Sequence, residues 1–269
     1  MKQFEYPRFT LDGKLTQEQK DFYDRFGFLH FENFYTPEVI KQILVEIENI
    51  QDKWIAENQV KSYGIPIKYG VEENGKKIVQ RYAFTSCYSD YLHDLLKDKR
   101  FRTLFELMPK PARIGELEKD GMVTNHYYNT DGPGNYNKLG WHTDCLRDVF
   151  YVKKIQPMLN VGISLDNSDA DKGGLRLIPG THIQNLYDLM FRKKYFMDNT
   201  EDPDEVAVYT KPGDLTIHDG RLWHRVALSP HKGEASRRRV IYFPIISGKY
   251  KPKTNKSWTP IYHKLWKIK

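Results

Sequence analysis

The 269-residue sequence has only two cysteines, Cys87 and Cys145, so it offers no framework of disulfide bonds and suits a reducing compartment. It also lacks the run of about twenty apolar residues that a membrane span needs, and its mean hydropathy is −0.68. No apolar stretch with a small-residue cleavage site follows Met1, so we expect no secretory signal and a cytoplasmic location. These absences exclude membrane-spanning proteins and small disulfide-stabilised secreted domains.

The net charge of +7 is concentrated at one end of the chain. Residues 247–269 include seven lysines and no acid, whereas the rest of the sequence has equal numbers of basic and acidic side chains. Proteins that follow nucleic acid phosphates need Lys and Arg spread along one face. We therefore expect a small-molecule partner and not a nucleic acid. The tail alternates lysine with Tyr250, Trp258, Tyr262 and Trp266, a pattern that predicts a segment covering apolar surface.

Helix signals dominate the first third of the chain. Thr16 and Gln19 form a capping-box pattern, which predicts a short helix that Gly27 ends. Thr36, followed by proline, starts a second helix in which apolar residues recur at helical spacing as far as Ile50. Residues 92–107 are again helix-like, whereas 61–90 lack periodicity and contain several glycines. That segment predicts hairpins and loops that shape the mouth of a pocket.

Beyond Pro111 the chain changes to short β-branched or alternating runs punctuated by glycine and proline. The runs lie at residues 121–128, 158–165, 175–178, 206–209, 215–218 and 240–246. Because no βαβ rhythm connects them, we predict a mainly β fold, an antiparallel barrel or jelly roll buttressed by the N-terminal helices. We expect one domain over 1–269, with a helical and loop-rich part at 1–110, a β core at 111–246 and the basic aromatic tail at 247–269.

The sharpest local pattern is a His-X-Asp tripeptide, His142 to Asp144. Side chains two residues apart on a strand point to the same face, so these two can bind one metal ion. Eighty residues further on, a turn, a strand and an Asp-Gly turn lead to His224. Two histidines and one carboxylate leave three positions open on an octahedral ion, which is typical of non-heme iron(II) oxygenases. His218 is the alternative third ligand, but it precedes the Asp-Gly turn, so we favour His224.

Three consecutive arginines, Arg237 to Arg239, lead into an apolar strand. A planar and permanently charged guanidinium suits a buried carboxylate partner. Alternation along the strand puts Arg238 on one face and its two neighbours on the other, so at most one face points inward. Two of the three are therefore expected to form a solvated basic edge.

Four motifs follow one another along the chain. They are the segment from Leu15 to Leu29 with the helix start after it, Trp141 to Asp144, Leu165 to His182 with its Gly-Gly-Leu-Arg-Leu-Ile-Pro-Gly-Thr-His ending, and His224. In this order they resemble the phytanoyl-CoA dioxygenase family of iron(II)- and 2-oxoglutarate-dependent oxygenases, over roughly residues 15–246. The resemblance implies a double-stranded β-helix that uses iron(II), 2-oxoglutarate and O₂.

The resemblance also implies roles for individual residues. It places the metal ligands at His142, Asp144 and His224, and the arginine that binds 2-oxoglutarate at Arg238. The gap between the last ligand and the arginines is longer than is usual in the family, so both neighbours of Arg238 stay alternatives. Asn125 and Asn129 share a strand face where related enzymes place amides on 2-oxoglutarate. The expected substrate contacts are Tyr63, Arg81, Tyr82 and Arg147, the last of which could instead pair with Asp148.

Members of the family decarboxylate 2-oxoglutarate with O₂ to succinate and CO₂ and remove a hydrogen atom from an unactivated C–H bond. Asp144 favours hydroxylation, because related halogenases have a small residue at that position. We therefore expect hydroxylation at an aliphatic carbon of a small polar metabolite that carries a carboxylate. Desaturation or oxidative cyclisation, a protein- or nucleic-acid-modifying oxygenase, and a non-catalytic metal-binding barrel remain alternatives.

Overall fold

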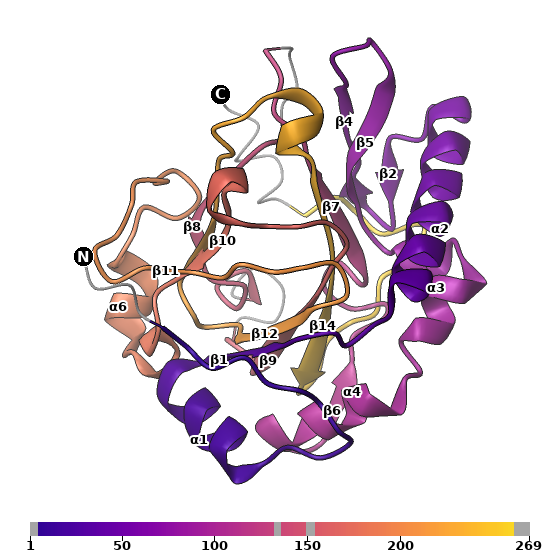
Figure 1. The fold of residues 1–269 in the computed structure, drawn as a ribbon. Helices are drawn as coiled ribbons and strands as arrows, with labels where there is room; N and C mark the ends of the chain where they lie inside the picture. The colour runs from indigo at the N-terminus through magenta and orange to yellow at the C-terminus, as the bar shows by residue number, and fades with distance from the viewer. Residues whose placement is uncertain (1–4, 132–135, 149–153, 261–269) are drawn as a thin grey trace.

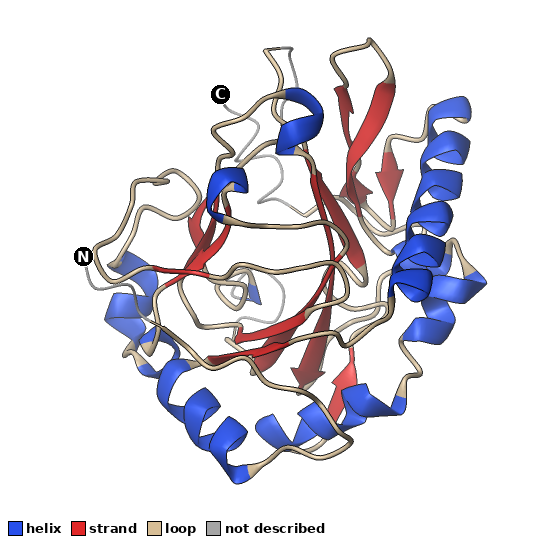
Figure 2. Cartoon of the chain, viewed as in Figure 1, coloured by secondary structure: helices blue, strands red, loops and turns tan. Residues whose placement is uncertain are grey.

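Two antiparallel sheets enclose a shared interior (Figure 1). A computed structural model describes residues 5–131, 136–148 and 154–260, so Tyr262 and Trp266 of the tail lie outside the described residues. Helices cover the outside of the larger sheet and the lower edge of the molecule (Figure 2). This is the predicted mainly β jelly roll with helices packed around it.

The larger sheet contains most of the strands. In spatial order they are β1 (Phe28–Phe31), β12 (Leu215–Asp219), β9 (Met158–Ser164), β14 (Arg238–Ser247), β7 (Val123–Tyr127), β5 (Lys77–Tyr82) and β4 (Lys68–Val71), with β6 (Ala112–Ile114) paired to β14. The smaller sheet has the order β11 (Val206–Ala207), β10 (Gly174–Leu177), β13 (His224–Ala227) and β8 (Leu139–His142). A separate pair consists of β2 (Lys61–Ser62) and β3 (Ile65–Pro66). The predicted strand runs are thus confirmed.

Alternation along the central strands separates the core from the interior cavity. The odd-numbered residues of three strands pack into the main apolar cluster: Leu159, Val161, Ile163, Leu215, Ile217, Ile241, Phe243 and Ile245. Even-numbered residues such as Asn160, His218 and Tyr242 line the cavity, which Phe243 of the core cluster also borders. Because side chains alternate with a period of two, the same strands build the hydrophobic core on one face and the site on the other.

The two long helices begin where the sequence predicts. In α1 (Gln17–Phe26) the side chains of Thr16 and Gln19 form the capping box, and Gly27 ends the helix with a φ of 79°, a left-handed conformation that favours glycine. In α2 (Pro37–Ala56) Ile43 and Trp54 are fully buried in the main cluster. This helix stands beside β5, as Figure 1 shows.

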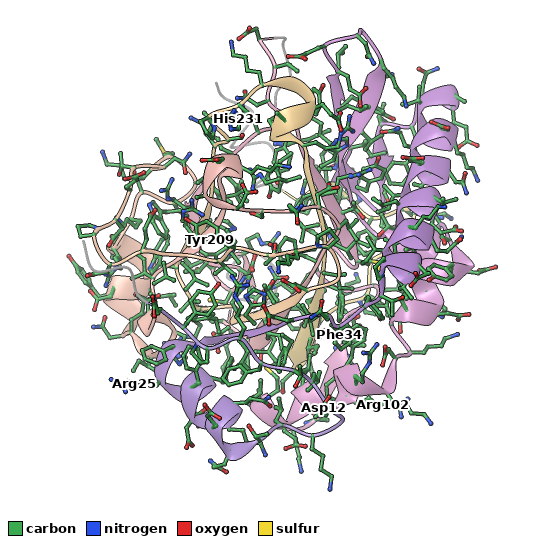
Figure 3. All side chains as sticks on the ribbon, viewed as in Figure 1. Asp12, Arg25, Phe34, Arg102, Tyr209 and His231 are labelled. Atoms are coloured by element: carbon green, nitrogen blue, oxygen red, sulfur yellow. The ribbon has the colours of Figure 1, made fainter. Side chains whose placement is uncertain are left out.

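The predicted helix over residues 92–107 is interrupted. It consists of α3 (Asp90–Leu95), α4 (Lys99–Thr103) and a 3₁₀ turn, η2 (Leu104–Leu107). Asp98 accepts a hydrogen bond from the backbone N–H of Arg100, so it caps a new helix at the point where the first one ends. The remaining short helices are η1 (Thr85–Cys87), η3 (Ala170–Lys172), η4 (Thr181–Ile183), α6 (Leu186–Phe191) and η5 (Gly233–Ser236). Charged residues such as Arg25 and Arg102 point outward from the helices (Figure 3).

The described part of the tail packs against the body of the protein. The backbone N–H of Lys253 donates to the carbonyl of Leu117, and the Tyr250 hydroxyl donates to Asp148 at 2.7 Å. Trp258, in contrast, is 91% exposed. No helix among the described residues has the length and apolar character that crossing a membrane requires.

Candidate metal centre

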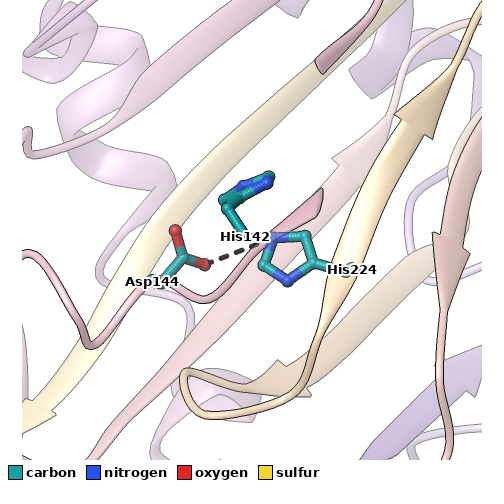
Figure 4. A group of neighbouring side chains, drawn as sticks. All are labelled: His142, Asp144 and His224. Atoms are coloured by element: carbon teal, nitrogen blue, oxygen red, sulfur yellow. Dashed lines mark ion pairs between the residues drawn. The ribbon is translucent and has the colours of Figure 1, made fainter. Parts of the chain in front are cut away.

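Three side chains at the edge of the smaller sheet converge (Figure 4). His142 ends β8 and His224 begins β13, and the two are register partners, so their ring centroids are only 4.1 Å apart. Asp144 lies in the turn after β8 and not on the strand as predicted, but its Oδ2 is 3.7 Å from Nε2 of His224. One ligand atom from each of the three residues lies within 4.8 Å of the others.

Hydrogen bonds orient both imidazole rings. Nδ1 of His142 is 2.8 Å from the carbonyl of Gly140, and Nδ1 of His224 is 2.9 Å from the carbonyl of Leu222. Because a carbonyl only accepts, each Nδ1 carries the proton and each Nε2 keeps a lone pair. Burial lowers the pKa of His142 to about 4 and holds the pKa of His224 well below its usual range. Two neutral imidazoles and a carboxylate are a donor set that fits iron(II).

Asp144 is held in place from both sides. Nδ2 of Asn160 donates to its Oδ2 at 2.7 Å, and Arg147 donates to its Oδ1 at 3.3 Å. Burial pushes the pKa of the carboxyl upward, but His218, His224 and Arg147 outweigh this effect and hold the pKa well below its usual range. The carboxylate is therefore ionised and fixed, as a metal ligand must be.

His218, the alternative ligand, lies beside the three converging side chains. Its Nε2 is 3.5 Å from Oδ2 of Asp144, and its ring centroid is 4.4 Å from that of His224. Neither ring nitrogen has a hydrogen-bond partner among the described residues. The convergent set of donor atoms nevertheless consists of His142, Asp144 and His224.

The three consecutive arginines differ in their partners. Arg237 contacts Glu72 at 2.8 Å, and Arg239 makes two hydrogen bonds of 2.9 Å to Asp166. Arg238 is buried, the described residues offer it no carboxylate, and its Nε has no hydrogen-bond partner there. Burial lowers its pKa to about 10. A buried guanidinium without an anion is unfavourable, so this position fits the carboxylate of a ligand.

A small cavity of about 40 Å³ lies against Arg238 and is partly lined by hydroxyl groups, among them those of Thr210 and Thr216. It shares the lining residues Tyr127 and Tyr242 with a larger cavity of about 900 Å³, which all three candidate metal ligands line. The two cavities adjoin, so a dicarboxylate could occupy both the cationic end and the space beside the ligands.

Three of the other predicted site residues line the large cavity: Asn125, Arg81 and Arg147. The pairing of Arg147 with Asp148 that the sequence left open does not occur, because Arg147 binds Asp120 at 2.8 Å and Asp148 instead binds Lys119. The loop-rich segment 61–90 contributes further to the lining through Lys68 and Tyr69. Arg147 thus belongs to the cavity wall and also contacts a candidate metal ligand.

Asn129, Tyr63 and Tyr82 do not line either cavity. Strand β7 ends before Asn129, and the amide of this residue donates to two carbonyls of the loop after β13. Tyr82 is fully buried and donates its hydroxyl to Gln51, while Tyr63 packs on Phe84. The sequence also overlooked Asn160, although an amide at an inward position of an otherwise apolar strand was a signal that could have found it.

A profile of the family described as phytanoyl-CoA dioxygenase matches residues 23–238, most of the chain. The chain belongs to the phytanoyl-CoA dioxygenase family. It is a 2-oxoglutarate-dependent dioxygenase that uses iron(II) and O₂, as the sequence predicted. One curated relative is a probable alpha-ketoglutarate-dependent hypophosphite dioxygenase of Stutzerimonas stutzeri. The two sequences are 23% identical over 225 residues, which cover 77% of this chain and 71% of the relative.

Two solved structures share the fold of this member of the phytanoyl-CoA dioxygenase family. HygX from Streptomyces hygroscopicus, crystallised with nickel and 2-oxoglutarate bound, has a TM-score of 0.63 at 15% identity, with 89% of this chain and 90% of HygX covered. The alpha-ketoglutarate-dependent carbocyclase SnoK from nogalamycin biosynthesis has a TM-score of 0.63 at 16% identity, with 97% and 94% covered. At such identities these likenesses show the jelly-roll fold alone.

Proposed function

We propose that His142, Asp144 and His224 bind iron(II), that Arg238 binds the distal carboxylate of 2-oxoglutarate, and that the enzyme hydroxylates an aliphatic carbon of a small polar metabolite. One observation carries the assignment of residues. A convergent His-Asp-His set and a buried arginine to which the described residues offer no carboxylate border adjoining cavities. This is the pair of features that a metal and a dicarboxylate cosubstrate require.

When bound, iron(II) with 2-oxoglutarate and O₂ supplies the oxidant that attacks a C–H bond of the substrate. The residues of the chain position the groups around it. Asn160 and Arg147 fix both oxygens of Asp144, so the carboxylate cannot rotate away. Phe196 stacks on the ring of His142 with centroids 4.6 Å apart and shields that ring from water.

The size of the large cavity supports a small-molecule substrate. A volume of about 900 Å³ encloses a metabolite, and the neutral body of the chain has no charge excess for a polymer. The hypophosphite named for the curated relative is itself a small polar anion, which supports the same class. Asp144 occupies a ligand position, which supports hydroxylation over halogenation.

The test is a substrate screen with the purified protein, iron(II), ascorbate and 2-oxoglutarate. Amino acids, osmolytes, acyl-CoAs and a methylated oligonucleotide are compared for stimulated succinate release, and mass spectrometry identifies the product. A metabolite that gains one oxygen is the expected result. Loss of two hydrogens would instead assign desaturation or cyclisation, and oxidation of the oligonucleotide alone would contradict the proposal. The variant His142→Ala serves as the control without activity.

We also propose that the chain is a single domain and works in a reducing cytoplasm. One apolar cluster that includes Leu11, Leu92 and Ile245 supports the single domain. Cys87 and Cys145 are both free, which supports the reducing compartment.

A further inference from the structure

His218 is a buried imidazole that the proposed set of metal ligands does not use. It belongs to β12, is 1% exposed and lines the large cavity. Neither Nδ1 nor Nε2 forms a hydrogen bond with the residues that the structure describes. A buried polar group without a partner is unfavourable, so we expect a molecule bound in the cavity to supply one.

Asp144 determines which ring nitrogen of His218 needs that partner. Nε2 lies 3.5 Å from Oδ2 of Asp144, longer than a good hydrogen bond. Because a carboxylate oxygen only accepts, the proton of the neutral ring belongs on Nε2, where it faces the negative charge. Nδ1 then keeps its lone pair, and this nitrogen requires a hydrogen-bond donor.

Asn160 provides a second acceptor beside His218. The two residues are register partners on β9 and β12, and both line the large cavity. Residues directly opposed on antiparallel strands have Cβ atoms about 4.5 to 5.5 Å apart. The Asn160 amide donates through Nδ2 to Oδ2 of Asp144 at 2.7 Å, so its Oδ1 remains an acceptor. The cavity wall therefore presents two neighbouring acceptors.

These two residues lie at the metal end of the interior. The His218 ring centroid is 4.4 Å from that of His224, and neither His218 nor Asn160 lines the small cavity against Arg238. Thr216, two residues earlier on the same face of β12, does line that small cavity. Two residues along a strand span about 6.6 Å. Strand β12 therefore leads from the proposed cosubstrate pocket to the metal ligands.

2-Oxoglutarate lacks the group that Nδ1 of His218 requires. Its two carboxylates and its keto oxygen only accept hydrogen bonds. Hydroxyl and ammonium groups donate them, so a substrate that carries either group supplies what the cavity wall lacks.

We propose that Nδ1 of His218, with Oδ1 of Asn160 beside it, accepts a hydrogen bond from a hydroxyl or ammonium group of the substrate. This inference rests on the proposed function, because it names the substrate class for that same cavity. His218 lies against both Asp144 and His224. The donor group is therefore held beside the proposed metal, and the oxidised carbon is expected within a few bonds of it.

Two matched pairs of probes test the inference: hexanol against its isomer methoxypentane, and hexylammonium against hexyltrimethylammonium. The first member of each pair donates a hydrogen bond and the second does not. Calorimetry without oxygen, on protein loaded with iron(II) and saturating 2-oxoglutarate, measures each dissociation constant. We expect the donor of each pair to bind roughly tenfold tighter, the effect of about one hydrogen bond.

Three variants identify His218 as the source of this preference. His218→Phe keeps an aromatic ring against His224 but removes both nitrogens, so the donors should bind roughly tenfold more weakly. The probes that do not donate should bind as before, and the variant should keep its iron. His218→Asn offers an amide oxygen in place of Nδ1 and should recover much of the preference. His93→Phe is the matched control, because His93 does not line the large cavity.

Equal affinity within both pairs would show that solvent satisfies His218, and would overturn the inference. A donor preference that persists in His218→Phe would overturn it too, as would loss of iron from that variant. A preference for hexanol alone would assign a hydroxyl, and a preference for hexylammonium alone would assign an ammonium group.

Succinate release in the substrate screen tests the proposed function separately. Release without any donor preference in binding would reject the role of His218 and keep the proposed function. A donor preference that depends on His218, without succinate release, would support the binding role and contradict the proposed function.

Discussion

Arg238 and Arg81 both place a guanidinium at the wall of the interior, but their surroundings differ. Arg238 is 6% exposed, borders a cavity of about 40 Å³ and meets no carboxylate among the described residues. Arg81 borders a cavity of about 900 Å³ and shares Asp120 with Arg147. A small pocket with an uncompensated charge fits one fixed cosubstrate. A large cavity lined by several charged side chains fits a substrate that must enter and a product that must leave.

The largest effect is expected at Arg238. Two described cations line the small pocket: Arg239 is paired with Asp166, which also lines it, whereas Arg238 forms no ion pair with a described carboxylate. Arg238→Ala should raise the dissociation constant for 2-oxoglutarate roughly thirtyfold to several-thousandfold, which corresponds to about 2 to 5 kcal/mol. Calorimetry with the iron-loaded protein measures it.

Arg237→Ala is the matched control, since that arginine is bound to Glu72 and does not line the small pocket. The Arg237→Ala variant should bind 2-oxoglutarate about as tightly as the unchanged protein does. Unchanged affinity in Arg238→Ala beside a large loss in Arg237→Ala or Arg239→Ala would move the assignment by one residue.

The smallest effect is expected at Tyr82, which the sequence assigned to the substrate. Tyr82→Phe removes a hydrogen bond to the buried Gln51, whose Oε1 still accepts from the backbone N–H of Val79. The free energy of unfolding should fall by about 1 kcal/mol, with kcat and KM unchanged. Urea denaturation and steady-state kinetics check both parts. A tenfold rise in KM without a loss of stability would restore Tyr82 to the substrate site.

Local patterns made much of the fold predictable. The capping box at Thr16, the glycine stop at Gly27 and the inward and outward alternation of the β runs depend on neighbours in sequence, and all appear in the structure. The break at Asp98 was missed because a cap within a helical pattern competes with apolar periodicity over the same residues.

Long-range partners limited what the sequence could say about the site. Strand parity predicted different surroundings for Arg238 and its neighbours, and their partners do differ: Arg237 binds Glu72 and Arg239 binds Asp166, whereas Nε of Arg238 has no hydrogen-bond partner among the described residues. It could not reveal that Asp120 joins Arg81 to Arg147, since that contact depends on how a strand and a distant turn pack together. Asn129 was misplaced for a related reason: the strand ends at Tyr127, so the expected parity no longer holds two residues later.

The iron content of the unchanged protein and three variants tests most directly the claim that His142, Asp144 and His224 bind the metal. Metal analysis after anaerobic loading and desalting should find one iron(II) per chain in the unchanged protein and in His218→Ala. His142→Ala and His224→Ala should both lose it, because each removes an Nε2 donor of the convergent set. If His218→Ala loses its iron and His224→Ala retains it, the third ligand is His218 and not His224. A full equivalent of iron in both His142→Ala and His224→Ala would contradict the account.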